Sequence, residues 1–167
     1  MKPTLVALLS AVMVSAAESP PGESCATAQR HEFDFLIGNW LVRGLMGEVA
    51  GTATIARAYG GCVLLETRLG VGSAGESLGI IGYQPERRSW HRDFLDPGGV
   101  VLTLEGERDG AAMVMTGKQY HADGLRLHRV TWTPTREGAV EERWQTSADG
   151  GRSWQAKFYG VFHRIAE

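Results

Sequence analysis

From residue 33 to the C-terminus, short runs of apolar and β-branched residues alternate with turn residues. Glycine pairs at 60–61, 98–99 and 150–151 separate several of these runs. This pattern is typical of short strands connected by tight turns. It predicts ten strands, at residues 39–45, 49–58, 62–69, 77–84, 89–95, 100–107, 111–119, 125–134, 139–147 and 153–165.

No segment keeps the 3.6-residue period of a long amphipathic helix, so we expect only one short helical turn, at residues 28–36. Evenly spaced strands with short connections pair in sequence order, as an antiparallel meander. A long meander exposes two edges unless it closes on itself. We therefore predict an all-β fold, a single closed antiparallel up-and-down β-barrel of about ten strands.

Side-chain alternation assigns the residues of each strand to one of two faces. In the last strand the even-numbered residues from Trp154 to Arg164 share a face, which we expect to line the barrel. Lys157 and His163 should then lie outside. In the first strand, Trp40 should point inward, because it is the residue that the end of the last strand has to meet.

The two ends of the barrel segment carry residues that would close it. Gly38 and Trp40 lie on the first strand and Arg164 on the last. A Gly-x-Trp with a basic residue on the last strand resembles the closing contact of lipocalin-like barrels, in which the indole plugs one end and a guanidinium lies across it. Such a cation–π contact stabilises by about 0.5–2 kcal/mol.

The first 17 residues have the features of a secretory signal peptide: Lys2, an apolar run at 5–14 and small residues at 15–17. The apolar run is shorter than the roughly 20 residues that cross a bilayer. We predict cleavage after Ala17, no membrane insertion after cleavage, and a periplasmic or secreted protein. The expected organisation is a signal peptide at 1–17, a Pro-rich linker at 18–30 and the barrel domain at 31–167.

Both cysteines, Cys25 and Cys62, remain after that cleavage. In an exported protein such a pair indicates a disulfide, which here would attach the N-terminal segment to the barrel wall. Closing the loop would stabilise by about 3–4 kcal/mol in the chain-entropy model. Two separate thiols are the alternative. A metal site is not indicated, because neither cysteine has a second Cys or a His at ligand spacing.

The net charge of the chain argues against some classes of binding partner. Its formal net charge is −2, which becomes −3 when Lys2 leaves with the signal peptide. This weak charge argues against nucleic acid and against an anionic membrane as partners. The remaining residues, about 150, are the usual length of one domain, and we expect a monomer.

Five motifs occur in order along the chain: residues 33–40 (Phe-Asp-Phe-x-x-Gly-x-Trp), 61–66 (Gly-Cys-x-Leu-x-Glu), 132–134 (Trp-Thr-Pro), 149–154 (Asp-Gly-Gly-x-x-Trp) and 162–164 (aromatic-x-Arg). In this respect residues 25–167 resemble a group of secreted bacterial proteins of unknown function. That group is similar to the calycin barrels, which include lipocalins, fatty-acid-binding proteins and the haem-binding nitrobindins. The resemblance implies a ten-stranded barrel with a central cavity. It implies no particular function, because one fold hosts many functions.

We interpret the interior as a site for a small apolar or amphipathic molecule, with aromatic side chains as its wall and a few polar groups that orient the ligand. The expected ligand contacts are Trp40, Glu66, Trp90, Arg92, Phe94, His128, Trp132, Trp144 and Phe158.

Glu66 and His128 leave a catalytic alternative open. Glu66 shares a face with Arg68, so an inward carboxylate would lie beside a guanidinium. It would orient a ligand, act as an acid or base in an isomerase, cyclase or lyase, form only a structural ion pair, or belong to a solvated wall. His128 is the second candidate for acid–base work in the lumen.

We predict no resident cofactor and no metal. Haem binding of the nitrobindin kind is the alternative, with His128 or His163 as a ligand. Because side chains alternate along a strand, His163 should face outward, and the glycine pattern after Gly44 departs from that of nitrobindins.

His91 and Asp93 share a face of their strand. They would form an imidazole–carboxylate dyad or, more commonly, a surface ion pair. Presentation of loops to a protein partner is a further reading, which an exposed apolar patch on the outer wall would favour.

The segment 147–154 fits the Asp-box pattern Ser-x-Asp-x-Gly-x-x-Trp. It occurs once, so we interpret it as a rigid hairpin and not as a sign of a glycosidase. Residues 75–79 match the pattern Gly-x-Ser-x-Gly, but they lead into the predicted strand at 77–84 and not from a strand into a helix, so they are not a nucleophile elbow. The chain has no phosphate loop and no zinc-binding His pair.

Overall fold

The computed structural model describes residues 25–72, 75–99 and 101–165. The predicted signal peptide, its cleavage position and most of the predicted linker lie outside these residues. In the part of the chain that is described, no helix is long and apolar enough to cross a membrane.

The ten predicted strands are present, and most boundaries differ from the prediction by one or two residues. They are β1 (Gly38–Arg43), β2 (Val49–Ala58), β3 (Val63–Gly70), β4 (Glu76–Gln84), β5 (Ser89–Leu95), β6 (Val101–Asp109), β7 (Ala112–His121), β8 (Gly124–Pro134), β9 (Val140–Ser147) and β10 (Gln155–Arg164).

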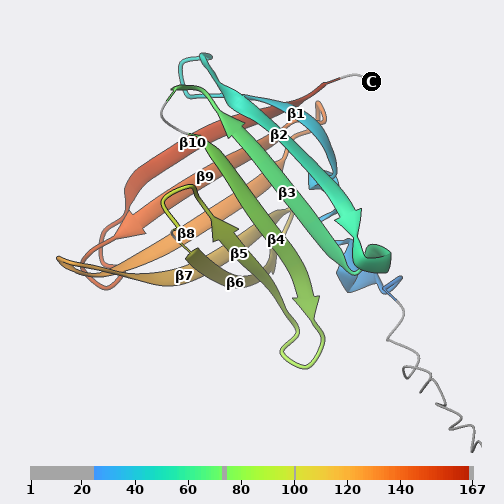
Figure 1. Ribbon diagram of the computed structural model, residues 1–167. Coiled ribbons are helices and arrows are strands. Elements are labelled where there is room, and N and C mark those ends of the chain that lie inside the picture. Colours follow the sequence, from blue (N-terminus) through green and yellow to red (C-terminus); the bar gives the residue numbers. More distant parts are fainter. Residues whose placement is uncertain (1–24, 73–74, 100, 166–167) are drawn as a thin grey trace, which may run out of the picture.

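The strands form a closed antiparallel barrel in up-and-down order, which confirms the predicted fold class. Each strand pairs with its neighbours in sequence, and β1 closes the barrel by pairing with β10 (Figure 1). The closing register places Trp40 opposite Arg164. Closure pairs the two outermost strands, whose full-length edges an open meander would expose.

Short 3₁₀ helices precede the barrel and close one of its ends, which we call the plugged end (Figure 1). They are η1 (Ala28–His31) and η2 (Asp34–Leu36), where a short helical turn was predicted. Phe33 is fully buried between two barrel tryptophans, with its ring centroid 4.9 Å from that of Trp90 and 5.6 Å from that of Trp132. The plugged end is therefore packed with aromatic side chains.

Trp40 and Arg164 make the closing contact at this end. The guanidinium carbon of Arg164 lies 4.3 Å from the centroid of the Trp40 ring, and the Trp40 indole donates to the carbonyl of Leu36 at 2.8 Å. Gly38 leaves room for the arginine, because a Cβ at that position would lie 2.2 Å from Arg164 Nη1. The φ of Gly38 is +143°, which L side chains rarely adopt.

A disulfide between Cys25 and Cys62 ties the N-terminal segment to the barrel, as predicted. Cys62 follows the short helix η3 (Tyr59–Gly61), which connects β2 to β3. Arg57 adds a second tie at this corner, because its guanidinium pairs with Asp34 and donates to the carbonyl of Gly61 at 2.5 Å. The acidic residue of the Phe-Asp-Phe motif thus fixes the plug to the wall.

The Asp-box segment forms the β9–β10 connection. The Asp149 carboxylate accepts hydrogen bonds from the backbone N–H of Ser153 at 3.0 Å and from its hydroxyl at 2.6 Å. The Ser147 hydroxyl accepts from the backbone N–H of Gly151 at 2.9 Å. These bonds lie within the turn itself, and the segment is the closed hairpin that the pattern predicted.

Candidate functional site

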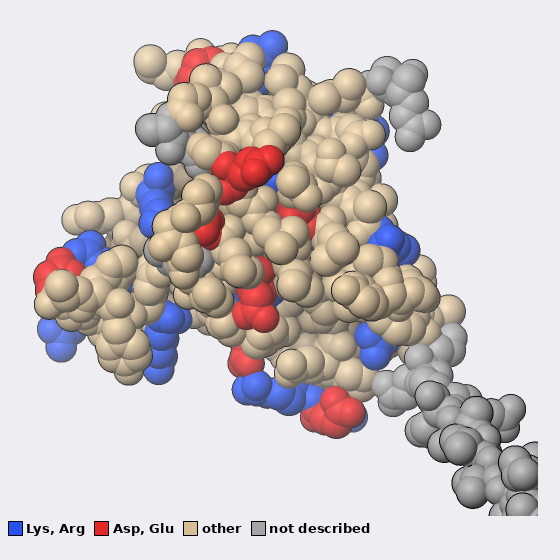
Figure 2. Space-filling view, viewed as in Figure 1, with Lys and Arg blue, Asp and Glu red and all other residues tan. Residues whose placement is uncertain are grey.

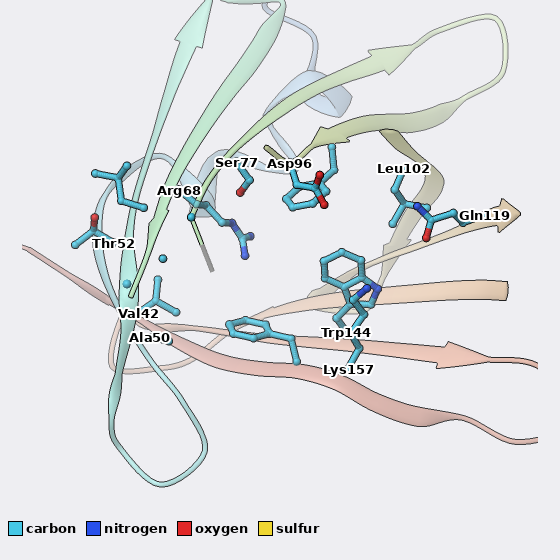
Figure 3. Close-up of a pocket in the computed structure, with 16 residues that line it drawn as sticks. Val42, Ala50, Thr52, Arg68, Ser77, Asp96, Leu102, Gln119, Trp144 and Lys157 are labelled. Atoms are coloured by element: carbon cyan, nitrogen blue, oxygen red, sulfur yellow. The ribbon is translucent and has the colours of Figure 1, made fainter. Parts of the chain in front are cut away.

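A pocket of about 350 Å³ lies inside the barrel at the end opposite the plug (Figure 3). Its lining residues come from every strand except β8, and we call it the lumen pocket. Most of them lie where β2, β4 and β6 begin or where β3, β5 and β7 end, which in an up-and-down barrel is one rim. The plug fills the other half of the barrel, so the pocket has one open end.

Three aromatic residues form the apolar wall of the lumen pocket: Phe94 on β5, Trp144 on β9 and Phe158 on β10. The rings of Phe94 and Trp144 meet edge to face, with 5.5 Å between their centroids. Leu102 and Val42 extend the apolar surface. Aromatic walls with a few polar groups are typical of sites for small ligands.

Four charged side chains form a layer across the barrel beneath the pocket: Arg92, Glu66, Arg68 and Glu142. Arg92 donates two hydrogen bonds to one oxygen of Glu66, at 2.6 and 3.1 Å. Arg68 donates to the other oxygen of Glu66 at 2.5 Å and to Glu142 at 2.5 and 3.2 Å. We call these four residues the charge layer. It holds two positive and two negative side chains, so its formal charge is zero.

The aromatic rings around the charge layer complete its contacts. Arg68 lies 5.0 Å from the ring centroid of Phe162, and Arg92 lies 5.0 Å from that of Phe94. The indole of Trp132 donates to Glu142 at 3.0 Å. Each buried charge therefore has hydrogen-bond or ring partners, as burial in a medium of low polarity requires.

Glu66 is a permanent carboxylate in this setting. Burial alone would raise its pKa, but the charges and hydrogen bonds of Arg68 and Arg92 lower it to about 2. A carboxyl group with this pKa is ionised at neutral pH and is a weak base. Of the roles that the sequence left open for Glu66, the geometry supports the structural ion pair.

Only Arg68 of the charge layer also lines the lumen pocket. Figure 3 shows its guanidinium pointing into the space between the strands. Three of its N–H groups are taken by the two glutamates, so the remaining N–H groups are available to a ligand. Arg68 is thus the cationic contact at the floor of the pocket.

His128 lies behind the aromatic wall. Its Nδ1 accepts a hydrogen bond of 3.0 Å from the indole of Trp144, while its Nε2 is buried and has no hydrogen-bond partner among the described residues. Burial, followed by the nearby positive charges of Lys157, His121 and Arg126, lowers the pKa of His128 to about 4. The imidazole is therefore neutral at pH 7, with its proton on Nε2.

Lys157 reaches the lumen pocket, although strict alternation predicted that it lies outside. The register between β9 and β10 shifts between Ala156 and Phe158, and Lys157 is the extra residue of this bulge. Its ammonium lies 4.8 Å from the centroid of the Trp144 ring. The prediction for Lys157 is wrong because a bulge breaks the two-residue period.

The same bulge changes the position of Trp154, which was predicted to line the barrel. The indole instead lies under the guanidinium of Arg129, 4.2 Å from the ring centroid. Arg129 faces outward from β8 and donates to Gln145, another outward residue, at 2.9 Å. Trp154 therefore belongs to the outer wall.

The structure divides the sequence-predicted ligand contacts among three places. Trp40, Trp90 and Trp132 belong to the plugged end, where their rings are buried. Glu66 and Arg92 belong to the charge layer, beneath the pocket. The residues that line the lumen pocket itself are Phe94, Trp144 and Phe158, with His128 directly behind Trp144.

The sequence analysis missed Glu142 and Lys157, and it named Arg68 only as a neighbour of Glu66. Glu142 could have been found, because it lies two residues from Trp144 and alternation places both on the inner face. Nothing in the sequence marks the bulge that brings Lys157 inward.

The histidines do not fit haem in the lumen pocket. The nitrogen of His128 on the lumen side already accepts the Trp144 hydrogen bond, and His163 is exposed on the outer face. His91 and Asp93, the other candidate dyad, form a partly exposed pair with 3.5 Å between Nε2 and Oδ1. This distance is typical of a surface ion pair.

No family model matches the chain, and a search of curated proteins finds no match either.

Proposed function

We propose that this protein is an exported, monomeric carrier or receptor barrel that binds a small apolar or amphipathic molecule in the lumen pocket. The observation that carries the proposal is the pocket itself. One half of the barrel is filled by the plug, whereas the other half holds about 350 Å³ of space behind three aromatic side chains. The charge layer separates the two halves.

The polar groups of the pocket favour an amphipathic ligand. Arg68 lies at the floor, and Lys157 lies beside Trp144, so a polar group of the ligand has two cationic contacts. The aromatic wall takes its apolar part. The resemblance to calycin barrels, many of which hold small molecules, agrees with this proposal.

Export is part of the proposal. The disulfide between Cys25 and Cys62 supports it, because disulfides persist in oxidising compartments. The signal-peptide features of residues 1–17 agree. Figure 2 shows acidic and basic side chains scattered over the viewed face, without a large basic patch for nucleic acid.

The test uses N-phenyl-1-naphthylamine, an uncharged apolar probe whose fluorescence rises when it leaves water. The protein should bind one equivalent of probe. In the variant Ser77→Trp, the new indole fills the lumen pocket and should weaken binding at least tenfold. Leu78→Trp is the matched control, because Leu78 is the next residue along β4 and faces outward with 40% exposure.

Native mass spectrometry of protein exported in a bacterial host then identifies the natural ligand class. A co-purifying mass would name it directly. Equal probe affinity in Ser77→Trp, or no saturable binding by the parent protein, would overturn the proposal.

A further inference from the structure

The barrel wall splits between β6 and β7 on the side of the open end. Their pairing runs from Asp109 opposite Ala112 to Leu104 opposite Gly117 and stops there. Both strands continue beyond this point, β6 back to Val101 and β7 on to His121. The ends of the two strands therefore separate, although each still pairs with its other neighbour.

A hollow on the outer wall lies at this split, and we call it the side hollow. It is lined by Thr103, Thr116, Lys118, Leu127, His128 and Trp154, together with Glu105 and Gly117. Successive residues of β6 and β7 face opposite sides of the barrel wall. Thr103 and Lys118 line the side hollow. Their neighbours Leu102 and Gln119 line the lumen pocket (Figure 3).

His128 lines this hollow and carries a buried ring nitrogen without a hydrogen-bond partner among the described residues. The residue is only 1% exposed, and its cross-strand partner on β7 is Gly117, where a Cβ would lie 2.2 Å from the backbone oxygen of Thr103. Because Nδ1 accepts from Trp144, the ring hydrogen is on Nε2, on the other side of the imidazole. Nε2 has no partner among the described residues. A buried donor without a partner is costly, and a bound acceptor would relieve that cost.

The charges around the hollow favour an anionic acceptor. Lys118 lies at its rim and forms no ion pair with the described residues. Lys157 adds positive potential at the imidazole, whereas Arg126 is paired with Asp123. The one acidic side chain of the lining, Glu105, is held by Arg87 through two hydrogen bonds of 2.6 and 3.0 Å.

We propose that the side hollow is a second binding site, for the carboxylate of a small organic acid. One carboxylate oxygen accepts the Nε2–H of His128, and the charge is paired with Lys118. The apolar part of the acid packs against Leu127 and Trp154, which line the same hollow. This site is separate from the lumen pocket, and its existence does not depend on the ligand proposed there.

The test is a titration of ¹⁵N-labelled protein with sodium benzoate at pH 7, followed through the two-bond ¹H–¹⁵N signals of the histidine rings. The Nε2 signal of His128 should shift saturably, with one benzoate bound. Four other histidines serve as internal references. Lys118→Gln should weaken binding about two- to fivefold, as expected for the loss of one exposed charge pair.

Two bulky variants locate the benzoate. Thr116→Trp fills the side hollow from the exposed outer face and should abolish the His128 shift, whereas Thr67→Trp, on the outer face of β3, should leave it intact. Ser77→Trp, which fills the lumen pocket, should also leave it intact. The proposal is overturned if His128 does not respond to benzoate, if its response survives in Thr116→Trp, or if Ser77→Trp removes it.

The backbone ¹H–¹⁵N spectrum of each variant shows whether it is folded. Should Thr116→Trp fail that check, the decision rests on Lys118→Gln against the parent protein. Unchanged affinity in that variant contradicts the proposed site. The naphthylamine experiment has its own readout, so failure of the lumen proposal and failure of this one are distinguishable.

Discussion

The two halves of this barrel are built from the same ten strands but differ in what fills them. The plugged half contains Phe33, whose ring meets those of Trp90 and Trp132 edge to face, and Trp40, whose ring meets that of Phe162 in the same way; all are nearly inaccessible to solvent. The open half contains the lumen pocket, with Phe94, Trp144 and Phe158 only half-buried. Buried aromatic side chains are therefore concentrated at one end, and the other end holds the pocket.

The charge layer marks the boundary between the halves. Glu66, Arg92 and Glu142 are almost completely buried, whereas Arg68 is 16% exposed in its side chain because it faces the pocket. A layer of paired charges limits how far an apolar ligand can enter, because displacing any one member leaves its partner unpaired. The difference between the halves predicts that substitutions in the plug act on stability and those in the pocket act on binding.

The largest contrast is expected between Trp40→Ala and Phe158→Ala. The first removes a buried indole, its hydrogen bond to Leu36 and its contact with Arg164, and should lower the free energy of unfolding by about 3–5 kcal/mol. The second removes a half-buried ring and should cost about 1 kcal/mol. Urea unfolding measures both. Probe affinity should fall only in Phe158→Ala, and equal stability losses would contradict the division into two halves.

Low pH should destabilise the fold by protonating the charge layer. The pKa of Glu66 is lowered from 4.5 to about 2, so its ion pairs contribute stability that is complete above about pH 4.5 and is lost as the pH falls toward 2. The contribution is about 3 kcal/mol at 1.36 kcal/mol per pKa unit. In Glu66→Gln that amount should be missing at pH 7, and the fall in stability between pH 5 and pH 2 should be shallower than in the parent protein.

Glu105→Gln is the control for this effect. Glu105 is paired with Arg87 on the surface, where an ion pair contributes less than about 1 kcal/mol. Its unfolding curve should follow the parent protein at every pH. A Glu66→Gln variant as stable as the parent at pH 7 would show that the charge layer does not stabilise the fold.

A substitution at Gly79 tests whether the charge layer needs the space beside this residue. A Cβ at this position would lie 2.6 Å from Glu66 Oε2, so Gly79→Ala should displace the carboxylate and destabilise by about 1–3 kcal/mol. Gly82→Ala on the same strand is the matched control, because the nearest atom to its Cβ would be Val63 Cγ2 at 4.0 Å. Thermal unfolding of the two variants should separate them; if both are neutral, the layer tolerates rearrangement.

The plugged half was largely predictable from the sequence. The closing contact of Gly38, Trp40 and Arg164 requires particular residue types. The Arg164 guanidinium lies across the Trp40 indole and occupies the space that a side chain at position 38 would fill. Glu66 and Arg92 were expected among the inward contacts, and both are buried. These predictions are correct because barrel closure and burial favour the same residue types at each of these positions.

The open half was less predictable, because irregularities of the wall shape it. The bulge between Ala156 and Phe158 and the split after the Leu104–Gly117 pair follow from the strand register around the whole barrel. The bulge carries no local sequence signal such as a Gly or Pro. The positions of Lys157 and Trp154 therefore could not be obtained from the period of their own strand.

Lys157 gives the smallest expected effect and the most direct test of how that bulge shapes binding. Lys157→Met keeps most of the side-chain volume but removes the cation above Trp144, which should change stability by less than about 1 kcal/mol. Affinity for the uncharged naphthylamine should stay the same. Affinity for its anionic relative 8-anilinonaphthalene-1-sulfonate should fall about two- to fivefold, because the exposed ammonium interacts weakly with a charged group. Equal affinities for both probes in parent and variant would mean that Lys157 does not contact the ligand, and Arg68 would remain as the cationic contact of the lumen pocket.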